Sequence, residues 1–334
     1  MVTWLAALIS ATAAFVIAVG LTPLLAGWAR RRNLLDVPNA RSSHVVATPR
    51  TGGAAFVPAL LVGLGLFQLF GERLAIEAFV MVSAASGLAL VGLVDDVRPL
   101  PAGVRLVVQV GIAGALVSAL GPLPMVLSGW PAAALTIVWL VAFTNAYNFM
   151  DGIDGIAGAQ AAVVGAGWAV LGVTSGSREL VVLGSLAVAV TAGFLVHNWL
   201  PARVFMGDAG SGFLGFYFGA LPFVAASKEP HVTTWAVLLM WPFLFDTAFT
   251  LLRRLRRREN IFSAHRSHLY QRMVISGASH ARVSLMYATL TGLGLAGSLA
   301  VAVNARVGGA VSALAVGVAA LALWWHVVSR EARD

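Results

Sequence analysis

The segment Trp4–Trp28 reads WLAALISATAAFVIAVGLTPLLAGW and contains 25 consecutive residues without a charged side chain. A helix rises about 1.5 Å per residue, so this segment is long enough to cross the ~30 Å hydrocarbon core of a bilayer. Its apolar residues do not alternate with polar ones, which indicates a helix rather than a barrel strand. No basic residue precedes it, as a cleaved signal peptide would require, so we interpret it as a retained first span.

The rest of the chain repeats this pattern. Of its 334 residues, 59% are hydrophobic and only 11% are charged, against about 25% charged in a soluble domain. The mean hydropathy is +0.86. A soluble fold cannot bury so much apolar surface, so we predict an all-α polytopic membrane protein with one domain over 1–334. We place eleven spans, at roughly 4–28, 53–70, 76–94, 104–120, 130–147, 156–174, 179–197, 212–227, 233–252, 283–303 and 308–328.

The net charge of +8 is best explained by membrane topology. If the spans alternate in direction, 18 of the 22 basic residues fall on one side, which the positive-inside rule makes cytoplasmic. The N-terminus then lies outside and the C-terminus inside. The two longest polar segments, 29–52 and 253–282, become cytoplasmic loops. We interpret the arginine run of 253–258 as an anchor for lipid headgroups and expect no nucleic-acid partner.

Six of the 14 acidic residues lie at or near the cytoplasmic ends of predicted spans. All six are aspartates: Asp95, Asp96, Asp151, Asp154, Asp208 and Asp246. An ionisable group at membrane depth is costly and is by default a functional candidate. Asp95 and Asp96 are adjacent, so their carboxylates repel each other unless a cation is near. The alternatives for this pair are a polar helix end, a divalent-cation site and a proton acceptor.

Two further strings contain three of these aspartates. In Asn145-Ala-Tyr-Asn148-Phe-Met-Asp151-Gly-Ile-Asp154-Gly, polar groups recur every third residue, which lines them up along one side of a helix. The alternative is a hydrogen-bonded seam between helices, for which carboxylates are a costly choice. In RVFMGDAGSG, residues 203–212, glycine amides at a helix N-terminus suit phosphate, but Asp208 would repel phosphate unless a metal lies between. Oxygen ligands and the absence of cysteine favour Mg²⁺ or Mn²⁺ over zinc.

A fourth string, His265-Arg-Ser-His268-Leu-Tyr-Gln-Arg272, lies in the basic loop 253–282. Arginine and histidine side chains are suited to pyrophosphate. Positive-inside charge would explain the arginines but not the two histidines. Carboxylates for a divalent cation, glycine amides and a basic cap together indicate a phosphate-handling enzyme whose second substrate lies in the membrane.

These four strings, in this order, resemble the polyprenyl-phosphate N-acetylhexosamine-1-phosphate transferase superfamily. Residues 36–53, DVPNARSSHVVATPRTGG, resemble the DxPNxRxxHxxPTPRxGG opening of its bacterial members. The resemblance covers nearly the whole chain and implies ten or eleven spans in the bacterial inner membrane, with a cytoplasmic active site. It implies transfer of a sugar-1-phosphate from a UDP-N-acetylhexosamine to undecaprenyl phosphate, with release of UMP. The lipid product would be the starting unit of O-antigen or another surface glycan. The resemblance leaves open whether the protein forms a homodimer.

The resemblance also implies roles at matching positions. Asp208 would ligate Mg²⁺, with help from Asn148. Asp95 and Asp96 would deprotonate or position the lipid phosphate, and we favour direct attack by that phosphate because it is largely ionised near neutrality. Asp151 would face the pyrophosphate of the donor.

The remaining matching positions imply substrate contacts. Asp154 and Phe205 would hold and stack on the uracil, and Asn145 would contact substrate from the same string as Asp154. A basic cap over the pyrophosphate and sugar would comprise Arg266, His268 and Arg272. Asp246, which matches a further aspartate of the family, would support the basic loop.

One departure bears on the sugar. Many relatives carry an Asp before the loop histidines and then an HxHH string, whereas His265 stands at that Asp position here and Tyr270-Gln271 follow His268. This form resembles the branch that handles N-acetylated 6-deoxyhexoses such as FucNAc or QuiNAc. It speaks against the peptidoglycan branch, whose substrate is UDP-MurNAc-pentapeptide, and leaves UDP-GlcNAc open.

Two other classes of protein keep acids in a membrane. A secondary transporter usually places them near the midplane between repeats, whereas these aspartates lie at one end and no repeat is visible. A CDP-alcohol phosphotransferase has an Ala-Arg pair shortly after its first Asp-Gly, and none follows Asp151-Gly152. Both alternatives are weaker than the sugar-phosphate transferase.

Overall fold

The computed structural model describes residues 2–38, 46–71, 73–125, 127–260, 263 and 265–331, and it is all-α apart from one short hairpin. Ten helices in these ranges are long and apolar enough to cross a membrane. Nine of them are α1 (Val2–Arg31), α3 (Ile76–Val97), α4 (Ala102–Leu120), α5 (Gly129–Met150), α6 (Ile156–Ser175), α7 (Arg178–Asn198), α9 (Val232–Arg256), α11 (His280–Val303) and α12 (Ala305–Glu331). The tenth joins the 3₁₀ turn η1 (Gly52–Ala55) to α2 (Phe56–Leu69). The predicted all-α membrane fold is confirmed.

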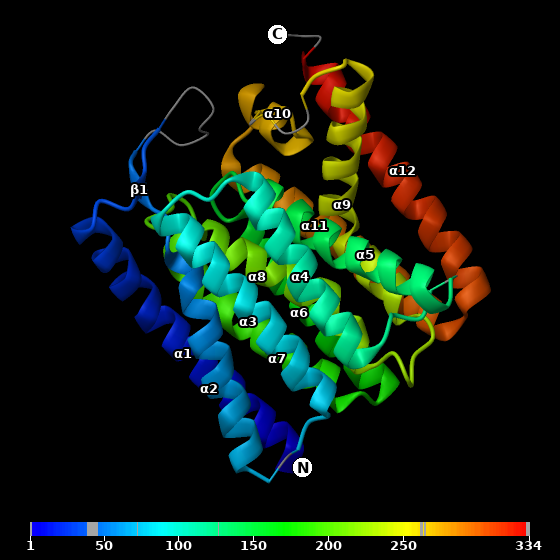
Figure 1. Ribbon diagram of the computed structural model, residues 1–334. Helices are drawn as coiled ribbons and strands as arrows, with labels where there is room; N and C mark the ends of the chain where they lie inside the picture. Colours follow the sequence, from blue (N-terminus) through cyan, green and yellow to red (C-terminus); the bar gives the residue numbers. More distant parts are fainter. Residues whose placement is uncertain are drawn as a thin grey trace.

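The predicted span at 212–227 corresponds to a shorter element. Here α8 (Gly207–Ala220) has 14 residues and continues into the 3₁₀ turn η2 (Leu221–Val224). Nearly all of α8 is buried among the other helices. In Figure 1 the chain termini lie at opposite ends of the bundle, as eleven crossings require if α8 and η2 together form one of them.

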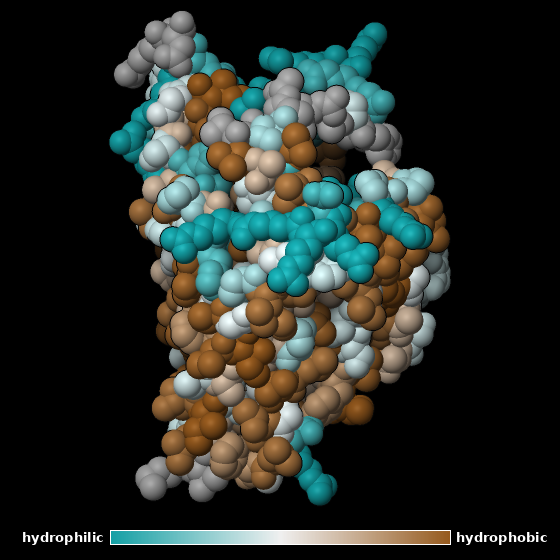
Figure 2. Space-filling model, turned by 90° about the vertical axis from the view of Figure 1, so that its left-hand side faces the viewer, coloured by the Kyte–Doolittle hydropathy of each residue, from teal (hydrophilic) through white to brown (hydrophobic). Residues whose placement is uncertain are grey.

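Polar segments gather at the end of the bundle that also holds the C-terminus (Figure 1). They include the antiparallel pair of β1 (Leu35–Asp36) and β2 (Thr48–Pro49), and the short helix α10 (Leu269–Ile275). The predicted motif residues 39–45 lie outside the described residues. Figure 2 shows brown, hydrophobic residues over the lower part of one face and teal, hydrophilic residues over its upper part.

Close helix contacts through glycine position the core. A Cβ on Gly184 of α7 would lie 2.6 Å from the Gly165 carbonyl oxygen of α6, so these two backbones touch. Small residues let membrane helices approach this closely, and more than half of the Gly-rich helix α6 is buried against other helices. A Cβ on Gly92 of α3 would lie 2.6 Å from the backbone nitrogen of Ala209, at the start of α8. Glycine at 92 therefore allows α3 and α8 to place Asp96 and Asp208 side by side.

Candidate active site

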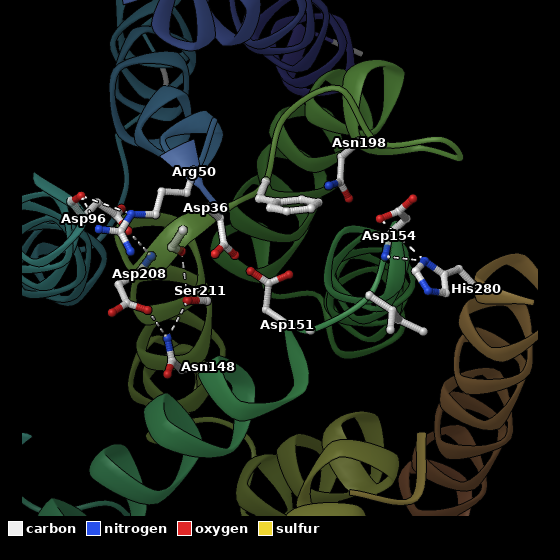
Figure 3. A pocket seen from close by; sticks show the side chains of 14 residues that line it. Asp36, Arg50, Asp96, Asn148, Asp151, Asp154, Asn198, Asp208, Ser211 and His280 are labelled. Carbon is white, nitrogen blue, oxygen red and sulfur yellow. Dashed lines mark hydrogen bonds and ion pairs between the residues drawn. The ribbon is translucent and has the colours of Figure 1, made fainter. Parts of the chain in front are cut away.

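A cavity of about 210 Å³ opens at the polar end of the bundle. Its lining comes from parts of the chain far apart in sequence: Asp36, Arg50, Asp96, Asn148, Asp151, Gly152, Ile153, Asp154, Asn198, Phe205, Gly207, Asp208, Ser211 and His280. Figure 3 shows Asp96, Asp208 and Asn148 on one side, Asp154 and His280 on the other, and Asp151 between them. Three of the four predicted strings therefore meet in one place.

Asp208 is the centre of a polar cluster. Its Oδ1 accepts a hydrogen bond from Asn148 Nδ2 at 2.7 Å, and the same Nδ2 donates to Ser211 Oγ at 2.8 Å. Its Oδ2 pairs with Arg105 Nη1 at 3.0 Å, and Nη1 also lies 2.9 Å from Asp95 Oδ2. Arg105, on α4, thus joins two predicted site carboxylates from α3 and α8.

The adjacent residues Asp95 and Asp96 face different partners. The Asp96 carboxylate accepts from the backbone N–H groups of Asp208 at 2.9 Å and Ala209 at 3.1 Å. These are first-turn amides of α8, which have no partner within the helix, so Asp96 caps it. The two amides are therefore engaged by a carboxylate, whereas we expected amides at this turn to suit phosphate. Asp95 accepts from Leu100 N at 2.5 Å and pairs with Arg105.

The N-terminal hairpin completes this side of the cavity. Arg50, which follows β2, donates from Nη2 to the Asp96 carbonyl oxygen at 2.9 Å. Gly207 has φ +72°, and a Cβ there would lie 2.6 Å from Asp96 Oδ2, so no larger residue fits between Arg50 and Asp96. The Phe205 N–H donates to the Pro49 carbonyl at 2.7 Å, which ties the loop before α8 to β2.

Asp151 lies in the turn between α5 and α6, half-buried and facing the middle of the cavity. Burial, followed by the negative charge of Asp208, raises the pKa of the Asp151 carboxyl to about 7. The protonation state of a carboxyl with this pKa changes when a cation or a phosphate enters the cavity. Gly152 lets α10 approach this turn, because a Cβ there would lie 3.1 Å from Tyr270 Cζ and closer still to its hydroxyl.

The far side of the cavity is built around Asp154. Its Oδ2 accepts from Ala202 N at 3.1 Å, and its Oδ1 lies 3.6 Å from His280 Nδ1. Asn198, the last residue of α7, accepts from Gly155 N at 3.0 Å and donates to Val204 O at 2.9 Å. These bonds fix the turn that carries Asp154 against the loop that carries Phe205.

A second cavity, of about 610 Å³, adjoins the first. It is lined by Leu88, Val91, Gly92, Asp95, Ala102, Gly103, Arg105, Leu106, Gln109, Thr144, Asn145, Asn148, Phe149, Asp208, Gly212, Thr247, Thr250, Leu251, Ser263, His265, His268 and Gln271. Asn148 and Asp208 line both cavities. Asn145 lies here, donating to Gln109 Oε1 at 2.7 Å. The second cavity thus extends from the Asp208 cluster between apolar residues of α3 and α4.

Asp246 fixes the basic loop from inside the bundle. The carboxylate is fully buried and accepts from His268 Nδ1 at 3.1 Å, Leu269 N at 2.9 Å, Tyr270 N at 3.1 Å and Tyr287 Oη at 2.6 Å. A negative charge at these first amides stabilises α10. The supporting role predicted for Asp246 agrees with this network, which holds His268 in the lining of the second cavity.

The other loop residues lie elsewhere. Arg272 forms a two-point ion pair with Glu331 at the end of α12, with Nε 2.6 Å from Oε1. Neither Arg266 nor Arg272 is among the described residues that line the two cavities. Burial, and then the proximity of His268, lowers the pKa of His265 to about 4, so that side chain is neutral near pH 7.

The cluster fits a hard divalent cation. Among the described residues no three His, Asp or Glu side chains converge as a complete metal cage. Mg²⁺ does not need one, because it usually binds one or two carboxylates together with substrate phosphates. Asp208 offers a carboxylate in the wall between two cavities. Asn148 turns its amide nitrogen toward Asp208, so in this arrangement it orients the carboxylate.

Several of these residues were not among the predicted site residues. Arg105 stands at a span edge, Asp36 and Arg50 stand in a loop, and His280 is a single histidine before a span. Asp36 and Arg50 belong to the DxPN…TPR string, and its resemblance to the family is the signal in the sequence that points to them. Nothing local in the sequence indicates that Arg105 or His280 reaches the site.

Comparison with known proteins agrees with this geometry. The family described as Glycosyl transferase family 4 matches residues 78–226. The probable undecaprenyl-phosphate N-acetylglucosaminyl 1-phosphate transferase of Bacillus subtilis is 30% identical over 289 residues, covering 81% of this chain and 78% of that protein. The decaprenyl-phosphate N-acetylglucosaminephosphotransferase of Mycolicibacterium smegmatis is 30% identical over 321 residues, covering 84% and 78%. A phospho-N-acetylmuramoyl-pentapeptide-transferase of Moorella thermoacetica is 34% identical over 209 residues, covering 56% and 64%.

The chain therefore belongs to the polyprenyl-phosphate N-acetylhexosamine-1-phosphate transferase family. It is a multi-pass membrane protein whose general reaction is the transfer of a sugar phosphate to a polyprenyl phosphate.

Proposed function

We propose that this enzyme transfers an N-acetylhexosamine-1-phosphate from a UDP-sugar to undecaprenyl phosphate at the cytoplasmic face of the bacterial inner membrane. The observation that carries the proposal is the meeting of two cavities at Asn148 and Asp208. The smaller cavity suits a nucleotide, with polar groups along its length and Phe205 in its lining. The larger one, with apolar walls from α3 and α4, suits a polyprenyl phosphate.

The reaction needs little covalent chemistry from the protein. An oxygen of the lipid phosphate attacks the β-phosphorus of the donor, and the bond from that phosphorus to the bridging oxygen breaks, so UMP leaves with that oxygen. Asp208 would hold Mg²⁺, which neutralises charge on the phosphates when bound. Asn148 keeps the Asp208 carboxylate oriented, and Arg105 adds a positive charge beside it. Asp95, which pairs with Arg105, would help to position the acceptor phosphate through that arginine, because a carboxylate alone repels a phosphate.

The names of the relatives and the sequence of the basic loop bear on the donor sugar. The Bacillus relative is named an N-acetylglucosaminyl 1-phosphate transferase and the Mycolicibacterium relative an N-acetylglucosaminephosphotransferase, and both align over more than four fifths of this chain. Two relatives named as phospho-N-acetylmuramoyl-pentapeptide-transferases, from Lacticaseibacillus paracasei and Moorella thermoacetica, align over 74% and 56% of the chain. The loop HRSHLYQR resembles the FucNAc and QuiNAc branch. We therefore propose GlcNAc, FucNAc or QuiNAc as the sugar, and O-antigen or another surface glycan as the product's use.

The test uses purified full-length protein with undecaprenyl phosphate, Mg²⁺ and a panel of UDP-sugars, and follows lipid product by mass spectrometry together with UMP. We expect a pyrophosphate-linked lipid with at least one UDP-N-acetylhexosamine, only when acceptor and Mg²⁺ are both present. The proposal is overturned if no UDP-sugar in the panel gives either lipid product or UMP exchange.

A further inference from the structure

The guanidinium of Arg50 is held in the first cavity by the end of α3. Figure 3 shows the side chain reaching from the end of the hairpin to the backbone of Asp96, where Nε and Nη2 donate to the carbonyl oxygen at 3.2 and 2.9 Å. Asp96 is the second-last residue of α3, and the N–H four residues further on, that of Leu100, donates to the Asp95 carboxylate instead. Arg50 therefore satisfies a carbonyl that the helix leaves open, and this contact fixes the plane of the guanidinium.

The backbone around Arg50 is fixed as well. The Pro49 carbonyl accepts from the Phe205 N–H at 2.7 Å, and the Gly52 N–H donates to the Phe205 carbonyl at 3.0 Å. The Arg50 carbonyl lies against Gly207, where a Cβ would overlap it. An arginine normally loses much rotamer freedom when it binds an anion, and an arginine ordered in advance loses less.

Arg50 has the donors and the charge to bind an anion. Of the five N–H donors of a guanidinium, two face the Asp96 carbonyl, and the other three have no hydrogen-bond partner among the described residues. Five carboxylates line the first cavity, whereas Arg50 is the only arginine or lysine among the described residues of its lining. A wall of carboxylates repels a nucleotide diphosphate, so Arg50 and a bound Mg²⁺ are the places where its phosphates are attracted.

The two cavities indicate which phosphate Arg50 faces. Arg50 lines only the first cavity, whereas Asp208 lines both. In the proposed reaction the β-phosphorus is attacked where the cavities meet, so the α-phosphate, which stays with the nucleotide, lies within the first cavity. As the bond from the β-phosphorus to the bridging oxygen breaks, its electron pair stays on that oxygen, and the α-phosphate of the departing UMP gains one negative charge.

We propose that Arg50 binds the α-phosphate of the donor and stabilises the charge that develops on the leaving UMP, an inference that rests on the proposed UDP-sugar function. Arg50 acts through hydrogen bonds and charge alone, because a guanidinium does not give up its proton in a protein. Hydrogen bonds between charged groups are the strong ones, and this one strengthens as the bridging oxygen departs.

The binding test uses full-length protein in nanodiscs with Mg²⁺ and three ligands that differ only in phosphate: uridine, UMP and UDP. Dissociation constants are measured by calorimetry for wild type and Arg50→Met. The matched control is Arg98→Met, which removes an exposed cation from the same end of α3 and lines neither cavity. Arg50→Met should weaken UMP and UDP by the same factor, about tenfold or more, and leave uridine within about twofold. Arg98→Met should resemble wild type with all three ligands.

Steady-state kinetics test the role in the reaction. Arg50→Met should lower kcat/KM for the UDP-sugar by about 100-fold and lower kcat itself, because the contact strengthens in the transition state. The KM for polyprenyl phosphate should stay within about twofold, since Arg50 does not line the second cavity.

The ratios among the ligands separate this role from a purely structural one. An arginine that only capped α3 would affect uridine, UMP and UDP alike, and that result overturns the inference, as does unchanged binding of all three. A loss confined to UDP would place Arg50 at the β-phosphate and also overturns it. If Arg50→Met does not fold, Arg50→Gln decides on the same ratios, because its amide can still donate to the Asp96 carbonyl without a charge. Wild-type protein that binds neither UMP nor UDP refutes the donor assignment itself, whereas wild-type binding with an unaffected variant refutes only the role of Arg50.

Discussion

The contact between α3 and α8 at Gly92 makes a sharp prediction about Asp208. A Cβ added at Gly92 would lie 2.6 Å from Ala209 N, and closer still to the Asp208 carbonyl, whereas ordinary contacts begin near 3.4 Å. These are backbone atoms, so no side chain can rotate away. Gly92→Ala must separate the start of α8 from α3 by about 1 Å, which displaces Asp208 from Arg105 and stretches the bonds from its amide to Asp96.

The expected result is a large loss of rate in a protein that still folds. Misplacing a reacting group by about 1 Å can reduce the rate about 100-fold. Overpacking lowers the free energy of unfolding by about 1–3 kcal/mol, and replacing glycine within a helix returns up to about 1 kcal/mol. The rate is measured as UMP release from the UDP-sugar, and folding is followed by thermal unfolding in detergent.

Gly87→Ala is the matched control on the same helix. A Cβ at Gly87 would meet Ile112 Cδ1 at 3.6 Å, an ordinary contact with the flexible end of a side chain. We expect this variant to keep wild-type activity and to equal wild-type stability or exceed it by up to about 1 kcal/mol. A folded Gly92→Ala protein with at least half the wild-type rate would refute the reasoning, because the spacing of α3 and α8 would then not control the site.

Three further predictions follow from other contacts. Asp208→Asn should abolish turnover and weaken Mn²⁺ binding, measured by electron paramagnetic resonance; an unchanged Mn²⁺ affinity would remove Asp208 from the metal site. The second prediction concerns Asp151 in protein without substrate or metal. Its pKa is about 7 in the folded state against an ordinary value of 3.8, so between these pH values the folded state keeps a proton that the unfolded state loses. The free energy of unfolding should therefore fall as pH rises from about 4 to 7 and then level off. Asp151→Asn should lack this decline and exceed wild-type stability at pH 8 by on the order of 1–2 kcal/mol, less than a dry site would give because the group lines a cavity; parallel unfolding curves across pH would contradict this. Arg272→Glu should reduce activity by releasing α10 from α12, and the exchange Arg272→Glu with Glu331→Arg should restore part of it; equal activity of the single and double variants would show that the ion pair does not position the loop.

The hydropathy of the chain was enough to predict the fold because a bilayer imposes one length on every span. The exception is α8, whose 14 residues fall short of a span, and whose buried environment comes from neighbouring helices rather than from its own composition. The sequence also predicted that the aspartates of three strings lie at one end of the molecule. Spans that alternate in direction place every second connecting segment on the same side of the membrane, and these aspartates lie at such segments.

The spacing of those aspartates in the sequence does not predict which partner each of them contacts. Asp95 and Asp96 are neighbours, yet one pairs with Arg105 and the other caps α8, since successive residues on a helix point about 100° apart. Asp36 reaches the cavity because β1 pairs with β2. The pairing involves only two residues on each strand, which is too short to produce a periodic pattern in the sequence. His280 reaches Asp154 across 126 residues of chain.

The central claim is that two substrates meet at Asp208, one from each cavity. The most direct measurement is the dependence of UMP release on both substrates, made with purified protein, a UDP-N-acetylhexosamine, undecaprenyl phosphate and Mg²⁺, with the lipid product weighed by mass spectrometry. The account predicts one UMP for each undecaprenyl-diphospho-sugar formed, and none when the lipid or Mg²⁺ is omitted. Sustained UMP release without the lipid, or lipid product without UMP, would contradict it.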